Sequence, residues 1–472
     1  MFPCQDTPSV KFTYTAQISV LRKFTVLMSA RLSKCNKNWE EAVYKFNQRK
    51  PVPSYAVIIA VGVFQKKVLN NRIHVFAENK FIDESFNTFY LGAIESMLKI
   101  AESLCGPYVW GRYDVCVLPP SIAHFKIECP CVAFISPALL RGDRSSISYS
   151  LTRNISQSWA GNLVTCAHYN DLWLNKSFSI FISRKIICKM SIHEEMMPFL
   201  RREEIINVYY MIEKCWQSGN ADLLKCLVPD LLQKDLLSHK TIDFVPYEMG
   251  CTLLDCLEDM LGPSLFESFL LSYFNEFAYK SISTDDWKKY LYRYFSDKKK
   301  MLDSLRWYAW FRVIPLLPIV PRMTALHIEC RKLAKEWVQW NETSSIPSII
   351  LERRSLCDVQ RELLLQYLYS FHTGLTKRKL KLILDIYIFD NDNGQIRFNW
   401  LLLCIKARWF EKVTTALDFA TEFCSPMIAC PIFEHLYEWI EMRSRAIKTY
   451  NRHKGKMLTE TREMLDKILH IN

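Results

Sequence analysis

The chain has 472 residues, of which 50% are hydrophobic and 23% charged, and this balance excludes a protein that is disordered over most of its length. Only 12 residues are glycine, well below the usual ~7%, which disfavours a β-barrel, a β-sandwich and a glycine-rich phosphate loop and favours helices. The formal charge of +12 predicts a soluble protein that attracts anions. At about 150 residues per domain, the length corresponds to roughly three domains.

In chain order, residues 1–62 are predicted to form strands, because Val10, Phe12 and Tyr14 alternate with polar residues. The apolar run from Tyr55 to Val61 indicates a further, buried strand. From about residue 81 to residue 105 the apolar residues take a helical spacing instead.

A strand is next predicted over residues 113–118, where Pro119 and Pro120 end it, and mixed helices are predicted over 145–310. The prolines of 315–325 cannot continue a helix, so this passage is interpreted as a linker. Beyond it every segment has helical spacing, and helices joined by short polar turns suggest a stacked layer of helix pairs, as in an α-solenoid.

Two basic runs, at 298–300 and 377–379, lie inside helical patterns. We interpret them as solvated helix faces. The alternative is a patch that binds nucleic acid or an acidic surface, but no nucleic-acid-binding signature accompanies them.

The 17 cysteines follow no disulfide framework, because the only close pair is Cys129 and Cys131 and no CxxC motif occurs. The first residues lack the basic and apolar regions of a signal peptide. The longest apolar run, Tyr55 to Phe64, is too short to span a bilayer. We therefore expect reduced, mostly buried thiols, no membrane span and a cytoplasmic location.

Several motifs are spread along nearly the whole chain in the order of one known family. They are Cys4–Tyr14, Pro107–Asp114 (PYVWGRYD), Leu118–Ser121 (LPPS), Ser158–Thr165 (SWAGNLVT), Trp173–Asn175 (WLN), Val245–Tyr247 (VPY), Ser281–Trp287 (SISTDDW) and Ile396–Trp400 (IRFNW). With these motifs the chain resembles the leukotriene A4 hydrolase and aminopeptidase B branch of the M1 zinc aminopeptidases. The match is closest to the leukotriene A4 hydrolase type.

The resemblance implies an α+β fold that is mostly helical. It consists of a β-saddle, a thermolysin-like α/β catalytic domain and a C-terminal armadillo/HEAT-like helical domain. The expected divisions are a remnant of the saddle over 1–62, a degenerate M1 peptidase domain over 63–314, the linker over 315–325 and the helical domain over 326–472. The family's saddle is much longer than 62 residues, so we expect a truncated gene, a splice product or a fragment that pairs elsewhere, with unpaired strand edges.

The resemblance also implies one Zn²⁺. In the family, the two His of HExxH bind the metal and the Glu between them activates the zinc-bound water. The corresponding residues here are Arg153, Asn154 and Gln157, and the flanking Ser158–Asn162 set the register. The third ligand, a Glu after Trp-Leu-Asn, corresponds to Lys176. Protonated Arg and Lys have no lone pair to donate, so we expect no metal and no other cofactor.

The substrate-handling positions of the family are partly kept. In the loop that corresponds to GxMEN, Phe125 and Lys126 replace the glycines and are expected to crowd the substrate path, whereas Glu128 is retained. Tyr247 matches the tyrosine that stabilises the oxyanion in the family. Its alternative interpretation is a packed tyrosine with a hydrogen-bonded hydroxyl.

Other family positions are replaced. Ile242 stands for a second tyrosine, and His239 for a carboxylate near the cleft wall. Ser425 and Met427 stand where the family has an Arg and a Lys that clamp a substrate carboxylate. The resemblance therefore implies that this clamp is lost.

Three other patterns imitate metal sites. His193 begins like HExxH, but Met197 ends the pattern, and His327 lacks the required spacing. We interpret both histidines as exposed or boundary residues. Asp390–Gly394 imitates the start of a calcium loop, but its Gly comes one place early and Leu401 stands where the bidentate Glu belongs, so we interpret it as a turn between helices.

The replaced cleft has an excess of positive charge from Arg153, Lys176 and Lys126. Because unpaired buried cations are costly, we expect Glu128 to pair with Arg153 or Lys176 and a small anion, such as phosphate or a carboxylate, to bind beside them. A solvated cleft is the alternative.

These observations predict a catalytically inactive relative that acts by binding an unknown protein or peptide partner, and not nucleic acid. One alternative is an enzyme after all: a weak zinc aminopeptidase or epoxide hydrolase, as the resemblance implies, or a metal-free hydrolase. The other is a decaying gene product without a selected role.

Overall fold

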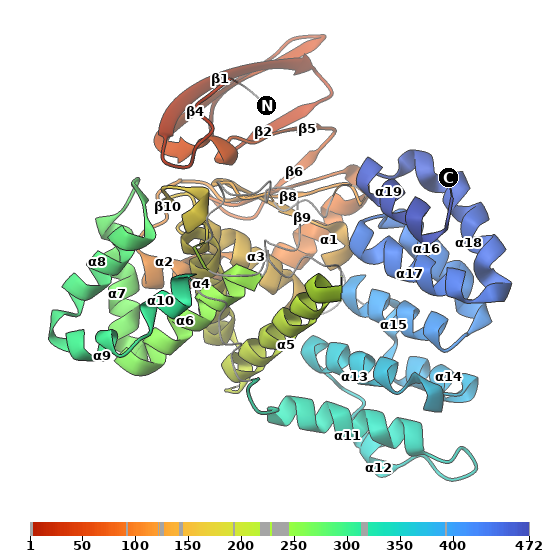
Figure 1. Cartoon of the computed structure of the whole chain (residues 1–472). Helices are drawn as coiled ribbons and strands as arrows, with labels where there is room; N and C mark the ends of the chain where they lie inside the picture. Colours follow the sequence, from red (N-terminus) through yellow and green to blue (C-terminus); the bar gives the residue numbers. More distant parts are fainter. Residues whose placement is uncertain are drawn as a thin grey trace.

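The structure is a computed structural model, and it describes residues 3–90, 93–120, 122, 127–140, 145–191, 194–217, 227–228, 245–312, 320–391 and 394–471. Three regions follow one another along the chain: a β region, a small sheet surrounded by helices, and a tiered array of helices that reaches the C-terminus (Figure 1). None of the described helices is both long and apolar enough to cross a membrane.

The N-terminal β region has five strands: β1 (Lys11–Leu21), β2 (Thr25–Met28), β3 (Arg31–Lys37), β4 (Glu41–Pro53) and β5 (Ile59–Gly62). β1, β4 and β3 form an antiparallel sheet with β4 in the middle, and β2 pairs with β5. Buried residues alternate with less buried ones along β4, as expected for a sheet with one covered face. The strands predicted for residues 1–62 are confirmed.

The run from Tyr55 to Val61 is not the single buried strand that its apolar character predicted. Residues Ser54–Ala56 form the short 3-10 turn η1, and β5 begins only at Ile59. Ile59 and Val61 are 54% and 47% exposed. These side chains are exposed because β5 is an edge strand: it pairs with β2 on one side and, within the described residues, has no strand on the other to cover them.

The central sheet contains β6 (Gln65–Val68), β7 (His74–Ala77), β8 (Asp114–Val117) and β9 (Val132–Ile135), in that order. β7, β8 and β9 are parallel, and β6 is an antiparallel edge strand. Phe76 and Val132 face the β region, where they pack with Leu27. Val75 and Ala133 face the helices. The sheet therefore has two covered faces, which explains why β7 and β9 are buried throughout.

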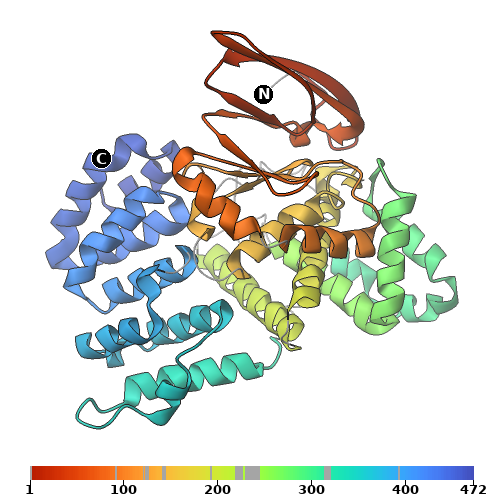
Figure 2. The same cartoon turned by 180° about the vertical axis from the view of Figure 1, so that it is seen from behind.

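Helices on the far side of this sheet are α1 (Asn79–Tyr90), α2 (Ala93–Cys105), α3 (Ser145–Gln157) and α4 (Trp173–Met190) (Figure 2). The rest of the central region comprises α5 (Met196–Gln217), α6 (Val245–Leu261), α7 (Pro263–Glu276), α8 (Thr284–Tyr294), α9 (Lys299–Asp303) and α10 (Trp307–Arg312), the short parallel pair β10 (Thr165–Cys166) and β11 (Ser281–Ile282), and the 3-10 turns η2 (Pro137–Leu139), η3 (Tyr169–Asp171) and η8 (Ser296–Lys298). Aromatic residues fill the core, where the rings of Trp173 and Trp287 meet edge to face at 5.1 Å and those of Phe178 and Tyr273 stack at 5.0 Å.

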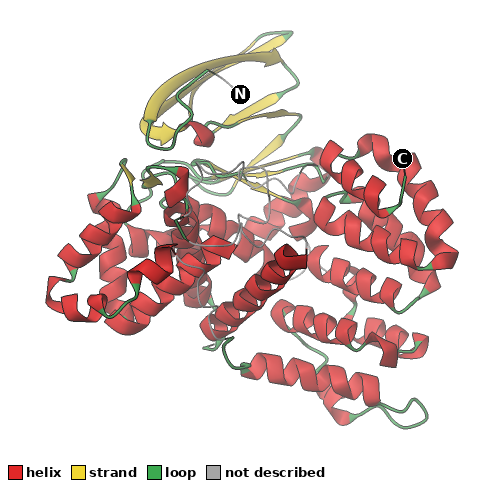
Figure 3. Cartoon of the chain, in the orientation of Figure 1, coloured by secondary structure: helices red, strands yellow, loops and turns green. Residues whose placement is uncertain are grey.

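The C-terminal region is entirely helical in its described part. Its elements are α11 (Ala325–Gln339), α12 (Ser348–Glu352), α13 (Asp358–Ser370), α14 (Lys377–Tyr387), α15 (Gly394–Lys406), α16 (Val413–Glu422), α17 (Pro426–Glu438), α18 (Ile440–His453) and α19 (Thr459–Ile468), with the 3-10 turns η9 (His372–Gly374), η10 (Phe389–Asn391), η11 (Phe410–Lys412) and η12 (Lys454–Lys456). α11, α13, α15, α17 and α19 pack one on the next, which forms the tiers of Figure 3. The predicted stack of helices is therefore confirmed. Of the predicted linker, residues 315–319 lie outside the described residues.

Two residues that the sequence placed near the surface are buried. Lys379, in one of the basic runs, is 5% exposed, and its Nζ donates to the carbonyls of Val338 and Gly374 at 2.6 and 3.3 Å. His327 is 1% exposed; its Nε2 lies 2.8 Å from Glu203 Oε1. In both cases a hydrogen-bond partner from a neighbouring segment offsets the loss of water around the buried polar group. His193 lies outside the described residues.

Candidate functional site

The cleft positions lie on two packed helices, α3 and α4. Arg153 and Gln157 are four residues apart on α3, so they share one face of that helix. The turn that ends α3 is held firmly, because Asn162 Nδ2 donates to the Gln157 carbonyl at 2.8 Å and Trp110 Nε1 donates to the Ser158 carbonyl at 3.0 Å. The motif that sets the register in sequence is thus also the segment that positions the end of the helix.

The start of α4 is anchored in a similar way. Trp173 Nε1 donates to Thr284 Oγ1 at 2.9 Å, and Asn175 Oδ1 accepts from the Cys166 amide at 2.8 Å. Lys176, the next residue, is 21% exposed. Its position is therefore set by two buried neighbours.

Lys176 forms an ion pair with Glu128, whose side chain is 18% exposed. The Lys176 Nζ also lies 6.0 Å from the ring centroid of Tyr247, at the start of α6. Tyr247 itself is 8% exposed. The structure thus brings together Glu128, Lys176 and Tyr247, and the expected pairing of Glu128 with one of the two cleft cations is confirmed, with Lys176 as the partner.

Asn154 and Arg153 of α3 interact with residues one turn earlier in the same helix. Asn154 Nδ2 donates to the Ser150 carbonyl, one turn earlier, at 2.9 Å. Burial raises the pKa of Tyr149 and the nearby charge of Arg153 acts in the opposite direction, while the Tyr149 hydroxyl donates to Glu204 Oε1 at 2.9 Å. Arg153 is therefore connected to an acidic cluster behind the cleft.

That cluster is centred on Arg184 of α4, which is 3% exposed. It contacts Glu204 of α5 and both Glu248 and Asp255 of α6. Arg201 of α5 adds a second cation, 3.0 Å from Asp255. Burial raises the pKa of Asp255, while the two arginines act in the opposite direction.

The sequence interpretation did not identify this cluster. A signal was present, because Arg184 and Lys185 interrupt the segment Phe178–Cys188, which is otherwise apolar except for two serines. Two permanent cations in such a position require carboxylate partners. Glu248, Asp255 and Glu258 on α6 supply them.

The residues at the family's metal positions do not match the donor set that Zn²⁺ needs, which is His, Cys or carboxylate. Arg153 and Lys176 offer cations, and Lys176 is already paired with a carboxylate. Across the described ranges, no three His, Cys, Asp or Glu side chains gather closely enough to hold a metal ion.

The carboxylate-clamp positions lie in the C-terminal region. Ser425 is buried just before α17, and Met427 is 78% exposed on that helix. Neither side chain can supply the positive charge that a carboxylate clamp requires. Phe125, Lys126, His239 and Ile242 lie outside the described residues, so a small anion held by Arg153, Lys176 and Lys126 stays a prediction.

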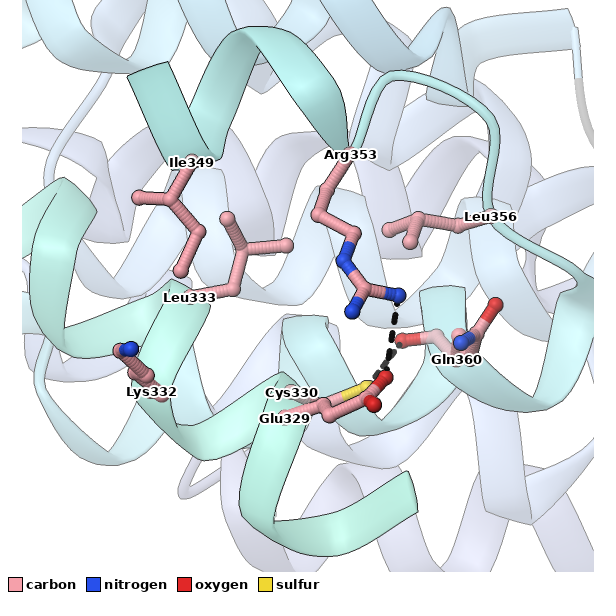
Figure 4. A pocket seen from close by; sticks show the side chains of 8 residues that line it. All are labelled: Glu329, Cys330, Lys332, Leu333, Ile349, Arg353, Leu356 and Gln360. Carbon is pink, nitrogen blue, oxygen red and sulfur yellow. Dashed lines mark hydrogen bonds and ion pairs between the residues drawn. The ribbon is translucent and has the colours of Figure 1, made fainter. Parts of the chain in front are cut away.

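A small pocket of about 140 Å³ lies among α11, α12 and α13 (Figure 4). Glu329 and Arg353 pair with each other at 3.0 Å, and the Cys330 thiol donates to the Gln360 carbonyl at 3.5 Å. These polar groups satisfy one another, so the pocket offers few groups that converge on a ligand.

Two family profiles match the chain. The one described as Peptidase family M1 domain matches residues 90–310, and the one described as Leukotriene A4 hydrolase, C-terminal, matches residues 358–469. The chain is similar to the leukotriene A-4 hydrolase of Xenopus laevis, with 35% identity over 100% of this chain and 77% of that protein. It is also similar to aminopeptidase B of Mus musculus, with 30% identity over 93% of this chain and 68% of that protein.

Among solved structures, native leukotriene A4 hydrolase from Saccharomyces cerevisiae is similar, with a TM-score of 0.87 and 26% identity over 100% of this chain and 76% of that one. The M1 zinc metallopeptidase of Deinococcus radiodurans is 19% identical, with a TM-score of 0.51 over 68% of this chain and 69% of that one. At 19% identity, the similarity to the Deinococcus radiodurans structure concerns the fold alone.

Proposed function

Because this chain belongs to the leukotriene A4 hydrolase branch of peptidase family M1, we propose that it is a catalytically inactive member of the family that acts by binding. Its partner is a protein or peptide. Its site is the altered cleft or the C-terminal helical array. We place it in the cytoplasm, where thiols such as its buried free cysteines remain reduced.

The observation that carries this proposal is the ion pair between Lys176 and Glu128. The resemblance assigns the first position to a zinc ligand and the second to the carboxylate that grips the substrate's amino group. Here the two side chains neutralise each other. Both roles are therefore lost through a single contact.

A second observation supports it. At the general-base position, the Asn154 amide donates to a helix carbonyl. An amide does not take up a proton in the physiological pH range, so it cannot accept one from water. Restoring a base there would still leave the metal positions changed.

The test compares the full chain with the fourfold variant Arg153→His/Asn154→Glu/Gln157→His/Lys176→Glu. We expect zinc far below one equivalent per parent chain and no aminopeptidase turnover. The fourfold variant is expected to bind zinc partially and to remain very slow, because small errors in positioning are costly in catalysis. Zinc is measured by elemental analysis, and turnover with an aminoacyl fluorogenic substrate.

The matched control is Asn154→Glu alone, which restores the base without the metal ligands and is expected to match the parent. About one tightly bound zinc in the parent, together with turnover that a chelator abolishes, would contradict the proposal. Turnover in the fourfold variant close to that of an active relative would show that the cleft is open to substrate.

A further inference from the structure

A cavity of about 430 Å³ lies between the N-terminal β region and the central sheet. Its walls come from β2, β3 and β4 on one side and from β6, β7, β8 and β9 on the other. The cleft residues on α3 and α4 do not line it, so it is separate from the candidate site described above. Its volume is within the range of small-molecule sites, about 300–1,000 Å³.

The inner wall of the cavity is apolar. Leu27, Phe76 and Val132 are each less than 9% exposed and belong to one small hydrophobic cluster, against which Phe64 packs. On the β-region side, Met28 belongs to a second cluster. The cavity lies along the seam between these two clusters, where an apolar ligand would gain contacts with both.

The mouth of the cavity is cationic. Lys66, Arg112, Arg31 and Lys37 all line it, and the acidic residue among the lining residues is Asp114. The charge of the lining residues is therefore about +3, from four cations and one carboxylate.

The cation nearest the interior, Arg112, is incompletely paired. Its Nη2 donates to His74 Nε2 at 3.0 Å and to Asp114 Oδ1 at 3.3 Å. Its Nε is buried, and within the described part of the chain it has no hydrogen-bond partner. That Nε is not accessible from the cavity, but the Arg112 side chain is 32% exposed, so an anion in the cavity would meet the outer Nη donors of the guanidinium.

The neighbouring charges support the same conclusion. Burial lowers the pKa of Lys66, and the proximity of Arg112 lowers it further. Burial also raises the pKa of Asp114 to about 6, against the effect of Arg112 and Lys66. Burial thus outweighs the attraction of Arg112 and Lys66 at Asp114, so these two cations are only partly neutralised by it and remain available to a further anion.

We propose that this cavity binds a small amphipathic organic acid, with its carboxylate beside Arg112 and Lys66 at the mouth and its apolar body against the inner wall. The apolar wall selects the body, and the incompletely paired guanidinium selects the carboxylate. A bound acid would also link the β region to the central sheet and so stabilise the fold by mass action.

The test uses the full chain with decanoate as probe, below its micelle concentration, measured by isothermal titration calorimetry. Phenylbutyrate serves as a ring-bodied second probe, 1-decanol as the neutral analogue and acetate as the headgroup alone. We expect one saturable site for decanoate or phenylbutyrate and much weaker binding of decanol and acetate. Absence of saturable binding for both acids, or equal binding of decanol and decanoate, would overturn the proposal.

The variants separate this site from general attraction to a basic protein. Arg112→Gln is expected to weaken decanoate binding about tenfold, the usual effect of losing one charge-assisted hydrogen bond. Lys66→Gln is expected to weaken it about threefold, because this lysine is more exposed. The control is Lys67→Gln, which removes the same charge from the adjacent residue of β6. Lys67 pairs with Asp83 and does not line the cavity. Equal affinity in Lys66→Gln, Arg112→Gln and Lys67→Gln would overturn the proposal.

Photolabelling provides a readout that does not depend on the folding of the variants. A diazirine analogue of decanoic acid is expected to label peptides that contain β2 or β9 in the parent chain. Excess decanoate should prevent this labelling. Labelling confined to α3 and α4 would place the acid in the other cleft and contradict the proposal.

Discussion

At the scale of single residues, the positive charges of the altered cleft are balanced by nearby side chains. Lys176 forms an ion pair with Glu128. Arg153 lies near Tyr149, whose hydroxyl donates to Glu204 in the acidic cluster around Arg184. Each cation that the resemblance places at a ligand position thus has an anionic or polar neighbour. Partners of this kind keep buried ionic groups from destabilising the fold.

The ion pair between Lys176 and Glu128 is expected to contribute measurably to stability because both side chains are largely buried. Glu128→Gln leaves the ammonium without its counter-charge, and we expect a loss of about 1–3 kcal/mol in the free energy of unfolding. The double variant Glu128→Gln/Lys176→Met should recover most of it. Chemical denaturation of the four proteins of this double-mutant cycle measures the coupling.

The matched control is the pair Lys377–Glu411, whose side chains are 54% and 52% exposed. Glu411→Gln is expected to have a much smaller effect on stability, as is usual for surface pairs. If Glu128→Gln and Glu411→Gln lowered the free energy of unfolding equally, the cleft pair would contribute no more to stability than an exposed pair.

At the scale of elements, side chains and close backbone contacts join the regions. Lys11, at the start of β1, donates from its Nζ to the carbonyls of Asn162, Leu163 and Lys280 at 3.2, 2.8 and 3.0 Å. Tyr55 donates to the Gly161 carbonyl at 2.5 Å. The β region is thereby attached to the turn that ends α3.

The Lys11 contact should make stability depend on pH. Burial lowers its pKa to about 7 in the folded chain, against about 10.4 for an unfolded lysine. Between these values the unfolded chain keeps a proton that the folded chain has lost, so raising the pH favours folding. We expect this group to add at most about 1.4 kcal/mol per pH unit from pH 7 upward and nothing below.

The measurement is the urea unfolding free energy at pH 6, 7, 8 and 9 for the parent, for Lys11→Met and for the exposed-residue control Lys23→Met. Lys11→Met should lack the rise above pH 7, whereas Lys23→Met should retain it. Parallel curves for all three proteins would show that Lys11 keeps its proton in the folded chain.

The helical array meets the central region at a close backbone contact. A Cβ added at Gly394, the first residue of α15, would lie 2.5 Å from both the carbonyl oxygen and the Cβ of Ala138 in η2. Gly394→Ala gains helix propensity of up to about 1 kcal/mol. The forced separation of packed backbone typically costs about 1–3 kcal/mol, so we expect net destabilisation.

Thermal unfolding compares this variant with Gly455→Ala, whose added Cβ meets no atom within 4 Å among the described residues apart from its own chain neighbours. The control is expected to change stability by less than about 0.5 kcal/mol, the usual range for a surface substitution. A Gly394→Ala protein as stable as the control would mean that α15 shifts away from Ala138 without cost.

At the scale of the whole molecule, the N-terminal β region exposes several large apolar side chains beside its strand edges. β1 and β3 are the outer strands of their sheet, and β5 pairs on one side only, among the described residues. Large apolar side chains are exposed along and between these strands: Leu21, Leu32, Trp39, Ile59, Val61 and Val63. Unpaired strand edges with exposed apolar side chains are templates for pairing with another chain, and the edge of β5 lacks the charged residues that β3 carries.

We therefore expect the chain to self-associate through the β region as its concentration rises. Val61→Lys places a charge on β5 and should shift the weight-average mass toward the monomer. Met427→Lys changes an exposed apolar residue of the helical array and should not. Light scattering coupled to size-exclusion chromatography measures both. A monodisperse parent monomer at high concentration, with no early proteolysis within residues 1–62, would contradict the expectation.

The sequence by itself determined the order of the regions, and through the resemblance it assigned residues to the family's site positions. Alternation in β1 and helical spacing beyond residue 325 are local patterns. The segment Ser158–Asn162 set the register of Arg153, and Trp173–Asn175 set that of Lys176. Patterns of this kind depend on neighbours along the chain, so they can be read without a structure. The burial of Ile59 and Val61 was predicted wrongly because an apolar run does not reveal whether a strand lies at an edge.

Tertiary structure alone decided which charges meet. Glu128 pairs with Lys176 and not with Arg153, and carboxylates of α5 and α6 converge on Arg184 of α4. The same holds for the burial of His327 and for the cavity between the β region and the central sheet. These features join segments far apart in the chain. Their distances and desolvation are set by how whole elements pack, and a linear pattern does not carry that information.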